Sequence, residues 1–531
     1  MISTAAALPL LLAVQPPATL APPLIDQQTE PPPAAPPDHA TVPSTPEQAI
    51  AVDADAAAVQ IKSVNFEGVE APEAVADAAR HFLGKPASRA TLTALAKAIA
   101  TAYGKSGIAL YTVAIPQQRL SDGHVRVLLA EGFVEEIVYP QGASPLIRAY
   151  AERLRAEKPL SRRALERYLS LMRDIPGAKV DVALLRGARP GGVRLSITPS
   201  RKKTDFSMGI DNRRQNGLGS GQFRASAQGN SLLRDGDRTD LVFLSALDFK
   251  RYRYFGFSHQ TPLGSDGLVL GLSASTLRTQ LKNYPVTGDA QTLGLTLSYP
   301  VIRSYKKNLT VSAGLDGLNS DAALLGAVLS SDHIRTARAA IGYGMIGRKS
   351  VLNASATLSR GLDIFGARGT EGFTDRIFTK WTGRAGYDRM LGKRFVGRLR
   401  LMGQYSGDRL SGNERLAIGG PEFGRAFDTA LLSGDRGMAG SFELALRPNL
   451  PEKFKGSELY GFVDGAKIHV KERLSLAAAD YGLASAGGGL RISYNPHASL
   501  GLEGARVIER PYAGADGGWR FNINWHVKMR R

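Results

Sequence analysis

The chain has 531 residues, 58 glycines, 29 prolines and no cysteine, and its 67 basic against 48 acidic side chains give a net charge of +19. Without cysteine it can form no disulfide framework, iron–sulfur cluster or thiol nucleophile, which excludes cysteine-based redox chemistry. The length predicts two or three domains unless one is a large β-barrel, and the charge points to nucleic acid or an anionic membrane surface.

The N-terminal residues are typical of an export signal followed by a linker. An apolar run at residues 8–14 is too short to cross a bilayer as a helix, and no lysine or arginine precedes it. We expect a signal peptide over residues 1–21. Proline and alanine dominate residues 22–60, which predicts a linker, with a possible short helix at residues 46–60 N-capped by Thr45.

Residues 61–202 contain one pattern of elements twice. The first copy predicts a strand at 61–66, helices at 72–83 and 92–103, and strands at 109–115 and 124–130. The second predicts a strand at 134–139, a helix opened by Ser144 and Pro145, a helix containing Leu165, Leu169 and Met172, and strands at 179–186 and 192–198. Two small β-α-α-β-β (α+β) modules, at 61–132 and 133–202, are therefore expected, and a single α+β domain is the alternative.

Helical periodicity ends near residue 203, and apolar and polar residues alternate from there to residue 531. Apolar Leu293, Leu295 and Leu297 alternate with small or polar residues, and the last segment alternates Phe521, Ile523 and Trp525 with Asn522, Asn524 and His526. About sixteen strands fit between Thr204 and Lys528, and an even count with a polar interior is typical of an outer-membrane barrel. The fold class predicted is membrane all-β. A sandwich or propeller is the alternative, but neither usually has so many long strands in succession.

The longest loop, at about residues 407–437, carries the most specific sequence of the chain. It contains Ile418-Gly419-Gly420-Pro421-Glu422-Phe423-Gly424-Arg425-Ala426-Phe427-Asp428 and then Leu432-Ser433-Gly434-Asp435-Arg436-Gly437. Phe462-Val463-Asp464-Gly465 follows, and Gly236-Asp237 lies in an early hairpin. Together these strings resemble the two-partner secretion transporters (TpsB) of the ShlB/FhaC/HecB family. In that family similar strings mark a sixth extracellular loop that folds back into the barrel, and the tandem modules are POTRA modules.

The resemblance implies that Arg425 in the loop pairs with Asp464 on the barrel wall. An arginine inside a barrel needs a carboxylate to receive its planar fork of donors. The implied loop motif comprises Gly419, Gly420, Phe423, Gly424, Phe427, Ser433, Gly434, Asp435 and Gly437, and the wall motif comprises Phe462 and Gly465. Gly424, Ala426 and Ala466 depart from the family's valine, glycine and glycine. The alternative is a solvated loop arginine and a wall carboxylate without a special role.

No catalytic set of residues emerges from the sequence. The eight histidines never have metal-ligand spacing, and no G-x-S-x-G or H-E-x-x-H string occurs, so we expect no enzyme, cofactor or metal. Residues 217–221 resemble a phosphate-binding loop but lack a following lysine and helix, which favours a hairpin turn. Arginine is spread along the chain, so a basic lumen or basic rims facing anionic lipid fit the charge better than nucleic acid does.

The resemblance implies an outer-membrane pore whose modules lie in the periplasm and recognise an unfolded, large, β-rich exoprotein. The exoprotein would cross the barrel extended and reach the cell surface, and the barrel would depend on outer-membrane lipid and the assembly machinery. The alternatives are a barrel-assembly factor, a barrel-anchored surface binding protein and a barrel-embedded hydrolase. We expect the inward loop, rather than the N-terminal segment, to be the main obstruction of the pore.

Overall fold

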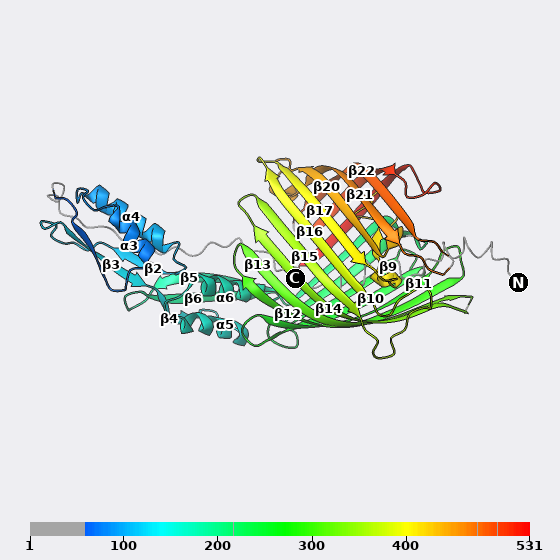
Figure 1. Ribbon diagram of the computed structural model, residues 1–531, viewed down its shortest axis with the longest axis horizontal. Helices are drawn as coiled ribbons and strands as arrows, with labels where there is room; N and C mark the ends of the chain where they lie inside the picture. The colour runs from blue at the N-terminus through cyan, green and yellow to red at the C-terminus, as the bar shows by residue number, and fades with distance from the viewer. Residues whose placement is uncertain (1–58, 216, 326, 475, 496, 531) are drawn as a thin grey trace. The chain divides into compact units, whose positions relative to one another are not determined.

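The computed structural model describes residues 59–215, 217–325, 327–474, 476–495 and 497–530 (Figure 1). They form two compact units, an N-terminal unit whose main segment ends at Arg201 and a unit that begins at Lys202. The predicted signal peptide, and nearly all of the predicted linker with its short helix, lie outside the described residues. Among the helices of the described ranges, none is long and apolar enough to cross a membrane.

The first module follows the predicted order of elements. It contains β1 (Ser63–Glu67), α3 (Glu73–Arg80), α4 (Arg89–Tyr103), β2 (Tyr111–Ala114) and β3 (His124–Glu131). Its sheet has the order β1-β3-β2, with β1 parallel and β2 antiparallel to β3. Leu92, Leu95 and Ile99 of α4 are fully buried in the core. The helix begins three residues earlier than predicted because Ser88 caps it, accepting the N–H of Thr91 at 3.2 Å.

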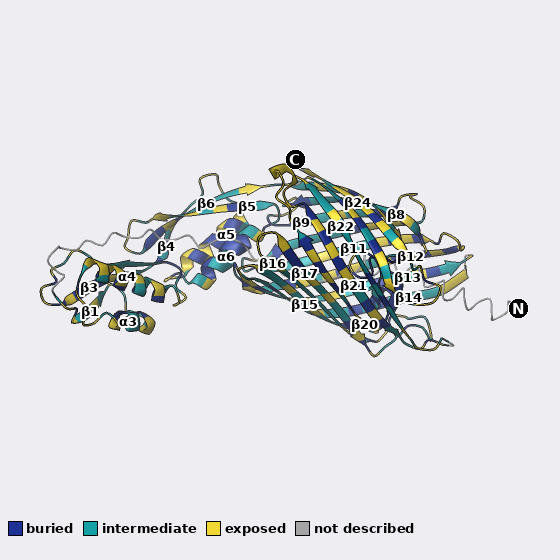
Figure 2. Ribbon diagram, turned by 90° about the horizontal axis from the view of Figure 1, so that it is seen from above, coloured by how far each residue is buried: buried dark blue, intermediate teal, exposed yellow. Residues whose placement is uncertain are grey.

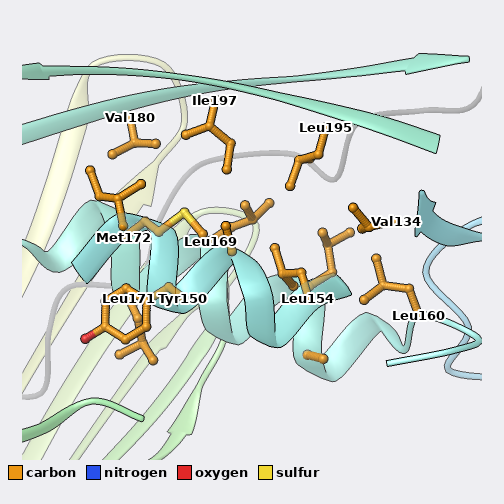
Figure 3. Close-up of a cluster of buried hydrophobic side chains, with 14 of the residues drawn as sticks. Val134, Tyr150, Leu154, Leu160, Leu169, Leu171, Met172, Val180, Leu195 and Ile197 are labelled. Atoms are coloured by element: carbon orange, nitrogen blue, oxygen red, sulfur yellow. The ribbon is translucent and has the colours of Figure 1, made fainter. Parts of the chain in front are cut away.

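The second module repeats the arrangement. It contains β4 (Phe133–Val138), α5 (Pro145–Ala156), α6 (Arg162–Asp174), β5 (Ala178–Arg186) and β6 (Gly192–Arg201), and its sheet has the order β4-β6-β5. Figure 3 shows Leu169 and Met172 of α6 pointing toward Leu195 and Ile197 of β6, which all lie in one buried cluster. Ser144 caps α5 as predicted, since its Oγ accepts the N–H of Ile147.

The two modules share part of one core. Ala109 and Leu110, from the first module, pack in the buried cluster of the second. The N–H of Ala109 donates to the carbonyl of Leu160 at 2.9 Å, and the N–H of Leu160 donates to the carbonyl of Gly132. The strand predicted at 109–115 therefore begins only at Tyr111, because Ala109 and Leu110 make their contacts with the second module.

The second unit is a closed barrel of sixteen antiparallel strands, which confirms the predicted fold class. The strands are β7 (Thr204–Gln215), β8 (Gly219–Asn230), β9 (Arg238–Ala246), β10 (Tyr252–Leu263), β11 (Leu268–Gln280), β12 (Val286–Arg303), β13 (Lys307–Leu324), β14 (Ala327–Ile346), β15 (Ser350–Gly361), β16 (Thr379–Leu391), β17 (Phe395–Ser406), β20 (Arg436–Leu446), β21 (Glu458–Val470), β22 (Ala479–Tyr494), β23 (Ala498–Glu509) and β24 (Trp519–Arg530). The pairing of β24 with β7 closes the barrel, so no strand edge is left open along it.

The two faces of the barrel wall differ as the alternation predicts. Figure 2 shows buried and exposed residues alternating along the strands. Leu293 and Trp525 are exposed on the outer face, whereas Asn522 and Glu443 are buried on the inner face. The outer face is therefore suited to lipid, and the lumen is lined by polar and charged side chains.

Two short connections match their predicted character. Residues 217 and 218 lie in the connection between β7 and β8, which pair antiparallel, so the glycine-rich string is part of a hairpin connection. In the connection between β8 and β9, the buried carboxylate of Asp237 accepts the N–H groups of Leu232, Leu233 and Arg234 at 2.7–2.9 Å. The Gly236-Asp237 string thus satisfies the backbone donors of a tight connection.

Candidate functional site

The connection between β17 and β20, residues 407–435, is called loop 6 here. It contains a short 3-10 helix (Gly412–Glu414) and two short strands, β18 (Leu416–Ile418) and β19 (Leu432–Gly434), which pair antiparallel. Its apolar side chains pack against inward-facing side chains of β20, β21, β22 and β23 in one buried cluster. The members from loop 6 are Leu416, Ile418, Phe423, Ala426, Phe427 and Leu432. Loop 6 therefore lies inside the lumen.

The tip of loop 6 binds the wall through backbone groups. Gly424 donates its N–H to Asp464 Oδ1 at 2.8 Å, and Arg425 donates its N–H to Asp464 Oδ2 at 3.4 Å. Ser485 Oγ donates to Asp464 Oδ1 at 2.6 Å and accepts the N–H of Ala426 at 3.4 Å. Asp464, a predicted site residue, thus holds the loop mainly by receiving two of its backbone N–H groups.

Gly424, one of the predicted motif residues, is required by this geometry. Its φ of +84° lies in the left-handed region, and a Cβ added there would be 2.7 Å from Leu483 Cδ1. A side chain at this position would therefore strain the backbone and push the tip away from the wall.

The guanidinium of Arg425 has more partners than the sequence predicts. Its Nη1 donates to Glu443 Oε2 at 3.0 Å and to Glu503 Oε2 at 3.3 Å, while its Nε lies 3.7 Å from Asp464 Oδ2. Its Cζ is 4.1 Å from the centre of the Phe462 ring, a cation–π contact. Arg425 and Asp464 therefore lie together, but the guanidinium directs hydrogen bonds to Glu443 and Glu503.

Glu443 and Glu503 also bind arginines of the barrel wall. Glu443 accepts hydrogen bonds from Arg398 and Arg491, each at 2.7 Å, and Glu503 accepts one from Arg213 at 2.8 Å. Both glutamates are buried. Each would keep a cationic partner if Arg425 moved away. The sequence motifs did not identify either glutamate, and the one signal available was their place on inward faces of alternating strands.

A second anchor holds the first part of loop 6. Glu414 of the 3-10 helix pairs with Arg338 of β14 at 2.7 Å and with Lys380 of β16 at 2.6 Å. Its backbone carbonyl accepts a hydrogen bond from Gln404 at 3.0 Å. Burial alone would raise the pKa of the Glu414 carboxyl, but the two cations hold that pKa below its ordinary value. Sequence reasoning missed Glu414 because it lies outside the motif strings.

A third anchor fixes the base of loop 6 at Asp435, another predicted motif residue. This fully buried carboxylate accepts the N–H groups of Leu410 and Lys471 at 2.8 and 2.9 Å. Arg473 Nη2 donates to it at 2.6 Å. Gly437 lies so close to β21 that an added Cβ would be 2.4 Å from the carbonyl oxygen of Lys467. The base of loop 6 thus needs a carboxylate at Asp435 and leaves no room for a side chain at Gly437.

The remaining predicted motif residues occupy different places. Gly419, Gly420, Phe427 and Ser433 lie within loop 6, whereas Gly465 lies on β21, opposite Gly440 of β20. The ranges that the structure describes contain no group of three or more His, Asp or Glu residues able to hold a metal ion.

A Gly424→Val variant should dock the tip of loop 6 less completely than the wild type. The valine would meet Leu483 and adopt a left-handed φ, which costs on the order of 1–3 kcal/mol. Docking can be measured as disulfide yield between cysteines placed at Ala426 and Ser485. Gly407→Val is the matched control, because the space around Gly407 is open. Equal yields in both variants would contradict the strain argument.

A sixteen-stranded barrel whose lumen holds an inward loop, preceded by two β-α-α-β-β modules, is the fold of outer-membrane transport proteins with POTRA modules. The family model for the haemolysin secretion/activation protein ShlB/FhaC/HecB matches residues 191–492, and the ShlB-type POTRA domain matches residues 59–132. The chain belongs to the ShlB/FhaC/HecB family. It is accordingly a two-partner secretion transporter of the outer membrane, with its N-terminal modules in the periplasm, and not an enzyme.

Named relatives and a solved structure agree with this assignment. The heme/hemopexin transporter protein HuxB of Haemophilus influenzae is 23% identical over 403 residues, which cover 71% of this chain and 70% of HuxB. The outer membrane transporter CdiB of Dickeya dadantii is 27% identical over 349 residues, 61% of this chain and 60% of CdiB. The solved structure of CdiB from Escherichia coli matches with a TM-score of 0.75 and 21% identity, and covers 96% of this chain and 98% of that one.

Proposed function

We propose that this transporter exports a large, β-rich TpsA-like exoprotein, which crosses the barrel in an extended form after loop 6 leaves the wall. The observation that carries the proposal is the position of loop 6, whose tip lies in the lumen on β20, β21, β22 and β23. A folded exoprotein and the docked loop would compete for the same space, so the client must be unfolded and the loop must move.

Capture of the client is assigned to the modules. In the sheet orders β1-β3-β2 and β4-β6-β5, the strands β2 and β5 lie at sheet edges. An extended segment can pair with such an edge through main-chain hydrogen bonds, which place little demand on its sequence. This mode suits a client that consists of many similar β-strands.

The ion pairs of the barrel wall would allow loop 6 to undock without leaving Glu443 and Glu503 buried and unpaired. When Arg425 withdraws, Glu443 keeps Arg398 and Arg491, and Glu503 keeps Arg213. An unpaired buried charge is costly, so these wall arginines lower the free energy of the undocked state. Asp464 would lose its hydrogen bonds from loop 6 and keep the one from Ser485.

The energy for export is assigned to the client itself. No nucleotide-binding motif occurs in the sequence, and folding at the cell surface buries apolar area and makes return unfavourable. Insertion of the barrel is assigned to the outer-membrane assembly machinery, and the apolar outer face is assigned to contact with outer-membrane lipid.

Co-expression with candidate exoproteins tests the proposal. One candidate should appear at the cell surface or in the medium only when the transporter is present. If no exoprotein is exported and other outer-membrane barrels are lost when the transporter is deleted, the protein is an assembly factor instead.

Deleting residues 420–434 should raise the single-channel conductance in planar bilayers several-fold, because the deleted tip fills part of the lumen. Deleting residues 15–60, behind a retained signal, should change the conductance little. Most of that segment lies outside the described residues. If deleting residues 15–60 raised the conductance more than deleting residues 420–434, the N-terminal segment would be the plug.

A further inference from the structure

The first residues of the connection between β15 and β16, Leu362, Ile364 and Phe365, border a cavity on the outer face of the barrel wall. β14 has 20 residues, and β15 ends at Gly361 opposite Thr336, so the first part of β14 extends beyond its partner. The connection continues the pairing: Leu362 donates its N–H to the carbonyl of Arg335 at 2.8 Å. Figure 1 shows this connection projecting away from the strands.

A cavity of about 610 Å³ lies between this connection and the outer faces of β11, β12, β13 and β14. Its apolar lining is made of outward-facing leucines and of three residues of the connection. These are Leu272, Leu293, Leu295, Leu315, Leu362, Ile364 and Phe365. Phe365 is 85% exposed and Leu293 61% exposed, so these apolar groups have no protein cover among the described residues.

One end of the cavity is polar and carries an unpaired positive charge. Arg335 uses Nη1 to donate to the carbonyls of Leu318 and Ile334, both at 3.0 Å. Within the described ranges it has no carboxylate partner, and Nε and Nη2 make no hydrogen bond. Its side chain lies over Gly317, where an added Cβ would be 3.6 Å from Arg335 Cδ. The side-chain oxygen of Asn319 is buried nearby without a hydrogen-bond partner.

The polar end faces the outer leaflet. β7 follows directly from the periplasmic modules, so β13 runs toward the cell surface and β14 runs back from it. Asn319 lies closer to the surface end of β13 than Leu315 does, and Arg335 pairs with Gly317 between them. The cavity thus has a cationic end toward the lipid headgroups and an apolar end toward the bilayer centre.

We propose that this cavity binds one phosphorylated glycolipid of the lipid A type from the outer leaflet. A phosphate would accept hydrogen bonds from Nε and Nη2 of Arg335, and an acyl chain would lie along Leu293, Leu295 and Leu315. The two backbone carbonyls already restrict the side-chain conformation of Arg335, so binding a phosphate costs little further conformational entropy. This site is separate from loop 6 and from export of the client.

Native mass spectrometry of the delipidated full-length protein in detergent tests the site with diphosphoryl lipid A and, separately, with phosphatidylglycerol. The wild type should retain one lipid A molecule, and Arg335→Gln should weaken its retention about tenfold or more, because a bond to a charged group is lost. Leu315→Trp should also weaken retention by filling the apolar end. Arg278→Gln is the matched control, since Arg278 is an outward arginine of β11 that pairs with Asp289.

The heat-modifiable gel mobility of each variant shows that its barrel is folded. Equal retention of lipid A by Arg335→Gln and Arg278→Gln would overturn the proposal. Equal retention of phosphatidylglycerol and lipid A by the wild type would also overturn it, because the cavity would then bind any anionic lipid. Failure of these lipid experiments would leave export of the exoprotein unaffected.

Discussion

An Arg425→Ala variant should insert into the outer membrane in normal amounts and export far less exoprotein than the wild type. Glu443 and Glu503 keep other arginine partners, so the barrel itself should remain intact. The tip of loop 6 loses its hydrogen bonds to Glu443 and Glu503 and its contact with Phe462, and a hydrogen bond to a charged group contributes about 1.5–3 kcal/mol. In the wild type the tip leaves the wall only while the client passes, whereas a tip that cannot return to the wall would keep Phe423 and Phe427 exposed in the lumen, where they would bind the client and stall it.

Export is measured as exoprotein in the medium, and insertion as heat-modifiable barrel in the membrane fraction. The reduction should be at least about tenfold, because even 1.4 kcal/mol changes an equilibrium tenfold. Arg214→Ala is a suitable control, since Arg214 is half exposed and lies 3.9 Å from Asp428 of loop 6. Wild-type export by Arg425→Ala would contradict the role assigned to the arginine.

Exchanging the two charges should not restore export. Arg425→Asp would place a carboxylate beside Glu443 and Glu503, and Asp464→Arg would remove the acceptor of two loop N–H groups. Restoration by the double variant would mean that the Arg425–Asp464 pair alone holds the loop.

Removing residues 61–199 should abolish export while leaving a stable barrel in the membrane. The barrel closes through the pairing of β7 with β24, and its strands begin at Thr204, so the deletion removes no part of the wall. Client capture is assigned to the modules, so no exoprotein should enter the lumen. Heat-modifiable mobility checks the barrel, and undiminished export would assign recognition to the barrel instead.

Much of the fold could be predicted because it depends on local patterns. Apolar residues such as Leu293, Leu295 and Leu297 alternate with small or polar residues because only one face of the barrel wall contacts lipid. This alternation predicted about sixteen strands, and the barrel has sixteen. The repeated β-α-α-β-β pattern reflects two small cores. The start of β2 could not be predicted, because Ala109 and Leu110 pack in the core of the other module.

The site was less predictable, because its partners come together only through strand register. The motif strings identified Arg425, Asp464 and Asp435. Ser441 lies opposite Asp464, and Asp464 opposite Ser485, only in the observed ladder of β20, β21 and β22. Glu414, Glu443 and Glu503 are single carboxylates without a local signal, and their role depends on which arginines the closed barrel brings near them.

A reversible disulfide between loop 6 and the wall tests most directly whether the loop must move during export. The chain has no cysteine, so Ala426→Cys with Ser485→Cys introduces the only two thiols, at positions that are in contact when the tip is docked. Each single variant serves as a control. Export should fall to background when the disulfide forms and return when a reductant breaks it. Wild-type export by the fully cross-linked protein would show that the client passes without displacing loop 6.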